Sequence, residues 1–70
     1  MSTVAIENAE NTVELQDALE KALNEIGCEL DVESTFEESR ERFAQDTEDG
    51  DGRAVAILDI AIKRWWELEG

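Results

Sequence analysis

The chain has 70 residues and carries 19 Asp and Glu against 6 Lys and Arg, which gives a net charge of −13. This shortage of cations disfavours direct binding to nucleic acid or to an anionic membrane, because both depend on Lys and Arg side chains. Because the sequence has no histidine and no tyrosine, it also lacks the usual base for a Ser or Cys nucleophile.

The length indicates one small domain, residues 1–70, with a core that adds only a few kcal/mol to stability. Cys28 is the only cysteine, so an internal disulfide is excluded, and we expect it to be a small buried hydrophobe rather than a reactive thiol. The first residues do not resemble a signal peptide, and the longest apolar run, residues 54–58, is too short to span a bilayer. We therefore expect a soluble protein in the reducing cytoplasm.

The first ten residues give the weakest structural signal. Val4 and Ile6 alternate with Thr3, Ala5 and Glu7, a pattern typical of a short strand or an extended segment. We predict coil over residues 1–10. Two alternatives remain open: the next helix begins earlier, or residues 3–6 pair with residues 28–32 in a two-stranded ribbon.

Residues 12–26 are predicted to form a helix. Asn11 is a good N-cap with an acid, Glu14, three residues later, and Gly27 is a typical helix end. The apolar residues fall on one stripe at helical spacing: Leu15, Ala18, Leu19, Ala22, Leu23 and Ile26.

Residues 28–32 alternate between apolar and acidic residues, which predicts an extended linker with Cys28, Leu30 and Val32 on one side. A second helix is predicted over residues 35–45, with Ser34 and Glu37 as its capping box. Phe36 and Phe43 form its thin apolar seam, and both need burial against the last helix because a helix this short is unstable alone.

The segment from Thr47 to Gly52 is an acidic, turn-rich loop, in which Asp51 can cap the following helix. We compared its spacing with an EF-hand calcium loop. With Gly52 at position 6, Asp49 and Asp51 fall correctly at positions 3 and 5, but Leu58 occupies position 12, where the bidentate Glu belongs. We expect a solvated capping loop rather than a metal site.

Residues 53–68 hold both tryptophans and are predicted to form the central helix. At 100° per residue, the apolar side chains occupy an arc of about half the circumference of this helix. More than one neighbouring element is needed to bury an arc this wide. Ile60 falls outside this arc, among Arg53, Arg64 and Glu67, where a side chain is expected to face solvent, and Trp66 lies at the edge of the arc. The arc comprises Ala54, Val55, Ile57, Leu58, Ala61, Ile62, Trp65, Trp66 and Leu68.

These elements predict an all-α fold, a small three-helix bundle with an extended linker between the first two helices. An α+β fold with the ribbon described above is the alternative. Acidic side chains are abundant, but acid–base catalysis requires environments that push their pKa values apart, usually through burial, and these acids fall on polar helix faces and loops. We expect no enzymatic activity, no cofactor and no specific metal site.

Negative charge is concentrated away from the last helix. Residues 29–51 contain ten acids and two arginines, whereas the acids and cations of residues 52–70 balance. Carboxylates three or four residues apart on a helix lie about 5–6 Å from one another, a scale comparable with successive phosphates on a strand. This pattern favours an inhibitor or adaptor that occupies the basic, nucleic-acid-binding surface of a partner protein.

We expect acids of the middle segment to make the electrostatic contacts and Trp66 to be an apolar anchor or a domain-edge packing residue. The expected contact residues are Glu37, Glu38, Glu41, Glu48, Asp49, Asp51 and Trp66. In size and acidity the chain resembles the small antagonists carried by phages, including DNA mimics and anti-CRISPR proteins. That likeness implies action in the cytoplasm of a host cell, but it assigns no site residue.

Two alternatives remain open. The chain can be a small structural module that forms a homodimer through its last helix, with acids that only keep it soluble. It can also owe its acidity to adaptation to high salt.

Overall fold

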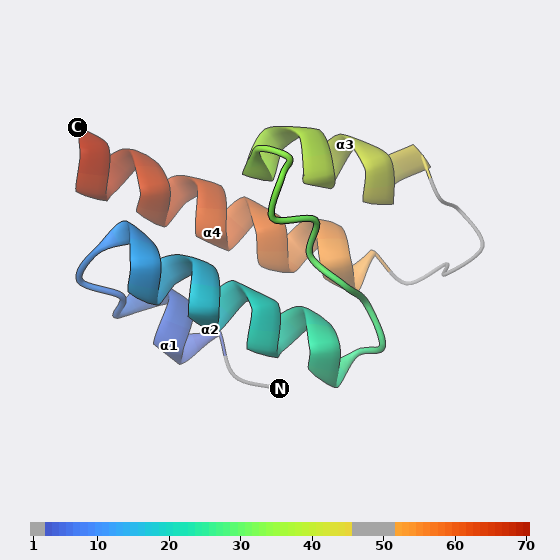
Figure 1. The fold of residues 1–70 in the computed structure, drawn as a ribbon, viewed down its shortest axis with the longest axis horizontal. Coiled ribbons are helices and arrows are strands. Elements are labelled where there is room, and N and C mark those ends of the chain that lie inside the picture. The colour runs from blue at the N-terminus through green and yellow to red at the C-terminus, as the bar shows by residue number, and fades with distance from the viewer. Residues whose placement is uncertain (1–2, 46–51) are drawn as a thin grey trace.

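The computed structural model describes residues 3–45 and 52–70, and within these ranges the chain forms helices and no strands. The helices are α1 (Val4–Glu7), α2 (Thr12–Glu25), α3 (Phe36–Gln45) and α4 (Arg53–Glu69) (Figure 1). The predicted all-α fold is confirmed, and the three predicted helices begin and end within one residue of their observed bounds. The α+β alternative is wrong, because residues 4–7 are helical rather than extended.

Helix α4 is the central element, since it packs against each of the other three helices. Figure 1 shows α3 packed on one side of α4. Helices α2 and α1 lie together on the other side of α4 (Figure 1). Ile57, Leu58 and Ala61 are buried within this packing. Ile60 also packs partly buried against the core. Its predicted place in solvent is therefore wrong, because neighbours on several sides widen the covered arc of α4.

Helix α1 was not predicted, because its sequence was interpreted as coil. Ile6 is fully buried and Ala9 is 3% exposed, whereas Val4 is exposed. Four residues cannot form a stable helix on their own. We infer that α1 is held by its packing against α2 and α4.

Helix α2 follows the prediction closely. The Asn11 side chain accepts a hydrogen bond from the Glu14 backbone N–H at 2.9 Å, and Glu14 in turn accepts one from the N–H of Glu10. At the other end Gly27 has φ 81°, and the N–H of Cys28 donates to the carbonyl of Leu23 at 2.8 Å. This pattern is a Schellman motif, in which a residue with positive φ ends the helix.

The linker is only partly as predicted. Cys28 and Leu30 pack against the core, but Val32 is 59% exposed. The chain turns after Asp31, whose side chain accepts hydrogen bonds from the backbone N–H of Glu33 and from the Ser34 hydroxyl, both at 3.0 Å. This turn ends the alternation that placed Val32 on the same side as Cys28.

The capping box of α3 lies one residue later than predicted. The Thr35 hydroxyl accepts from the Glu38 N–H at 3.1 Å, and the Glu38 carboxylate accepts from the Thr35 N–H at 2.9 Å. The predicted pair, Ser34 and Glu37, is therefore wrong, because Ser34 belongs to the preceding turn.

The two phenylalanines of α3 pack on the core as predicted, with Phe36 buried and Phe43 partly buried. Phe36 meets Trp65 of α4 edge to face, with the ring centroids 5.4 Å apart. Helix α4 begins after Gly52, which has φ 68° and provides no side-chain cap. Asp51, the predicted cap, lies outside the described residues.

Candidate protein-interaction surface

Four of the seven predicted contact residues lie within the described residues: Glu37, Glu38 and Glu41 on α3, and Trp66 on α4. All four are exposed. Glu48, Asp49 and Asp51 lie outside the described ranges.

Glu38 has a structural role that the sequence analysis missed. Its carboxylate closes the capping box. The pKa of Glu38 is lowered mainly by the hydrogen bond from the Thr35 backbone N–H and then by the one with the Thr35 side chain. Nearby Arg42 lowers it further. Glu38 therefore keeps its negative charge, but one of its carboxylate oxygens already accepts a hydrogen bond from the N–H of Thr35 at the start of α3.

Glu37 and Glu41 are better placed to contact another molecule. They lie four residues apart on α3, so they share one face of the helix. Both are exposed, and among the described residues neither takes part in an ion pair or a side-chain hydrogen bond. No cation of the described part of the chain is therefore in direct contact with either carboxylate.

Most cations of the described residues are instead engaged within the protein. Arg40 of α3 pairs with Asp59 of α4, and Arg42 reaches Asp31 at 3.5 Å. Lys21 pairs with Asp17 one turn earlier on α2 at 3.2 Å. These exposed ion pairs add little to stability, but each neutralises one acid and leaves the others in excess.

Arg64 is the most important residue that the sequence analysis missed. Its Nε and Nη2 atoms both donate to the backbone carbonyl of Ala9, at 2.8 and 2.7 Å. Its position on the polar face of α4 gave no signal of this contact, because Ala9 lies 55 residues earlier in the chain. Arg64 ties the segment after α1 to the central helix.

Asp31, Ser34 and Arg42 form a small polar cluster beside the start of α3. Arg42 donates to the Ser34 hydroxyl at 3.2 Å, and Ser34 donates to Asp31. The pKa of Asp31 is lowered mainly by the hydrogen bond from the backbone N–H of Glu33. The hydrogen bond from the Ser34 hydroxyl lowers it further. This cluster fixes the turn between the linker and α3.

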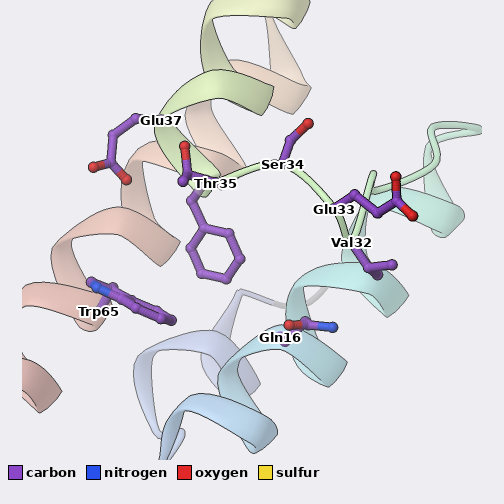
Figure 2. A pocket seen from close by; sticks show the side chains of 8 residues that line it. Gln16, Val32, Glu33, Ser34, Thr35, Glu37 and Trp65 are labelled. Carbon is purple, nitrogen blue, oxygen red and sulfur yellow. The ribbon is translucent and has the colours of Figure 1, made fainter.

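A hollow of about 340 Å³ opens beside this turn. Three apolar side chains line the hollow: Trp65, Phe36 and Val32. Trp65 is half-buried and Phe36 is buried. Figure 2 shows Glu37 on the same side as Trp65, with Glu33 and Val32 on the other side. The lining is completed by Gln16, Ser34 and Thr35, so no Lys or Arg lies among its residues.

The two tryptophans differ in their surroundings. Trp65 packs against the core and Phe36, as its central position in the predicted arc indicated. Trp66 is 62% exposed, so it does not serve to pack the core of a single chain. Exposed tryptophan is a common interface residue.

Residues 3–45 and 52–70 hold no group of three His, Cys, Asp or Glu placed to bind a metal, and the loop compared with an EF-hand lies mainly outside these ranges. No helix in the same ranges has the length and apolar content needed to cross a membrane.

Comparison with models of protein families, with curated proteins and with solved structures finds no match for this chain.

Proposed function

We propose that the protein is a non-enzymatic inhibitor or adaptor that acts in the cytoplasm by occupying the basic, nucleic-acid-binding surface of a partner protein. In this proposal its carboxylates take the place of nucleic-acid phosphates, as in a DNA mimic. The observation that carries the proposal is the pair Glu37 and Glu41, exposed on one face of α3 and without ion pairs among the described residues.

The distribution of charge supports this proposal. Residues 3–45 carry twelve acids and only three cations, Lys21, Arg40 and Arg42. All three cations are paired with acids of the same chain. A surface with this excess attracts basic proteins over long range and speeds their association at low salt.

The alternative function is a homodimer formed through α4. The packing of α4 weakens this alternative, because α1, α2 and α3 of the same chain already cover most of its apolar arc. Trp66 is the one large apolar side chain of described α4 that stays mostly exposed. It is equally available to a different partner.

The proposal is tested by immobilising the chain and capturing proteins from a cell extract, followed by elution with rising salt or with double-stranded DNA or RNA. A nucleic-acid-binding protein that is released by moderate salt and displaced by its own nucleic acid supports the proposal. A captured protein that nucleic acid does not displace contradicts the mimicry. Self-association of the purified chain without any partner would instead favour the homodimer.

A further inference from the structure

We propose that the hollow beside Trp65 binds one arginine side chain of the basic partner, with the guanidinium on the exposed part of the indole and within reach of Glu33 and Glu37. This inference rests on the proposed function, because it names the chemistry by which the acidic surface recognises its partner.

The hollow has room for an arginine side chain. Its volume of about 340 Å³ lies at the small end of ligand-binding cavities. An arginine carries an aliphatic stem that can cover Val32, and a flat cationic head that can lie against Trp65. The hollow offers both an apolar wall and a charged rim to one group of this shape.

The charges around the hollow favour a cation. Glu33 and Glu37 line it, and within the described residues neither carboxylate has an ion-pair partner. Arg42 bonds to Ser34, one of the lining residues, but Asp31 balances its charge. An incoming cation therefore meets uncompensated negative charge next to an aromatic ring, which attracts cations through its π face.

An anion is disfavoured although α3 begins at the hollow. The backbone N–H groups of Thr35 and Glu38 already donate within the capping box. Glu33, Glu37 and the ionised Glu38 would also repel an anionic group. The capping box leaves the N–H groups of Phe36 and Glu37 at the start of α3, so it is the repulsion from these three carboxylates that disfavours a phosphate there.

Arginine is favoured over lysine for two physical reasons. The guanidinium is planar and more weakly hydrated than an ammonium group, so it stacks on an indole at a smaller cost in lost hydration. It also presents several N–H donors in a fork, which suits carboxylates placed on two sides of the hollow (Figure 2).

The test is a titration of the isotopically labelled chain with acetyl-glycyl-arginyl-glycine amide, followed by the indole N–H signals in nitrogen–proton correlation NMR spectra. The Trp66→Phe variant assigns the two signals, since Trp66 is mostly exposed. We expect a saturable shift of the Trp65 signal and little change at Trp66. The same peptide with citrulline, which is neutral, should give no shift, and the lysine peptide should bind more weakly.

Matched variants on α3 separate a site from general attraction. Glu37 lines the hollow and Glu41 does not, although both are exposed. Glu37→Gln should weaken binding of the arginine peptide about threefold, the loss of one exposed ion pair, while Glu41→Gln, which lies outside the hollow, should leave binding of this peptide nearly unchanged. Equal effects of the two variants, or equal shifts at Trp65 and Trp66, would overturn the proposal.

The remaining outcomes are also decisive. A Trp65 signal that moves with protein concentration alone would show that a second copy fills the hollow, and the proposal would fail. Capture of a DNA-displaceable partner with no response at Trp65 would reject the arginine site but leave the proposed function standing. Arginine binding at Trp65 without any such partner would support the site and contradict that function.

Discussion

Glu38 shows how a single carboxylate on an acidic surface can have a structural role. The pKa of Glu38 is lower in the folded protein than its ordinary value of 4.5. Its contribution to stability is therefore complete above pH 4.5 and is lost as the pH falls through the lower pKa of the folded state. Glu38→Gln should therefore lower the free energy of unfolding at neutral pH and have no effect in acid, where Glu38 itself is protonated. Urea unfolding at a series of pH values measures the difference.

Glu37→Gln is the matched control, because it removes one charge from the neighbouring position but touches no cap. Relief of general repulsion is common to both variants, so the difference between them isolates the extra strength of the hydrogen bond that the charged Glu38 carboxylate accepts from the Thr35 N–H, since a Gln amide accepts only a weaker one. If Glu37→Gln showed the larger loss at neutral pH, the capping box would lie at Ser34 and Glu37 after all.

Ser39 is buried at 1% exposure, and its hydroxyl has no hydrogen-bond partner among the described residues. Ser39→Ala removes this buried hydroxyl and also favours the helix, so it should raise the free energy of unfolding by about 1 kcal/mol. Ser34→Ala, which loses hydrogen bonds with Asp31 and Arg42, should have the opposite sign. Denaturant unfolding of both variants tests this, and a destabilised Ser39→Ala would contradict it.

Residue-level details of this kind were only partly predictable. Ser34 and Thr35 each have a glutamate three residues later, so the spacing alone could not decide which of them caps α3. The choice depends on Asp31, which holds Ser34 in the preceding turn. In contrast, Asn11 had no competing neighbour, and its cap was predicted correctly.

At the scale of elements, we expect Arg64 to help its packing hold α1 in place, because it bonds to the Ala9 carbonyl just after α1. Arg64→Met keeps an unbranched side chain but removes both donors to the Ala9 carbonyl, which should cost about 1–2 kcal/mol. The Asn8 amide, which donates to Val4 in α1, should then exchange with solvent faster than amides in the middle of α2. Hydrogen-exchange NMR measures this.

Lys63→Met is the control for Arg64→Met, because Lys63 is an exposed cation of α4 without an ion pair among the described residues. It should leave stability and the exchange of α1 nearly unchanged. If α1 exchanged at the same rate in both variants, the packing of Ile6 rather than Arg64 would hold it.

The longer helices were predictable because caps and apolar periodicity agreed along each of them. Helix α1 was not, since a helix of four residues shows no periodicity and is stabilised by contacts with α2 and α4. Ile60 was misplaced for a related reason. A helical wheel assumes one buried side, whereas α4 has neighbours on several sides.

At the scale of the whole molecule, the separation of a core helix from an acidic exterior was predictable from charge counts along the chain. The hollow was not, because its lining comes from α2, the linker, α3 and α4. No motif joins Gln16, Val32 and Trp65 in the sequence. Of the predicted contact residues, Glu37 lines the hollow and Glu38 belongs to the adjacent cap.

The central claim is that the acids of α3, rather than negative charge in general, bind the partner. Its most direct test compares two double variants with equal change of charge: Glu37→Lys with Glu41→Lys on α3, and Glu7→Lys with Glu10→Lys around α1. All four residues are exposed, and α1 and α3 lie on opposite sides of α4 in Figure 1.

The measurement is the affinity of each variant for the captured partner at low salt, with circular dichroism to verify that both remain helical. The account predicts that the α3 variant loses affinity by at least about tenfold, as expected when two charge contacts become repulsive, while the α1 variant loses much less. Equal losses in the two variants, or unchanged affinity in the α3 variant, would contradict it.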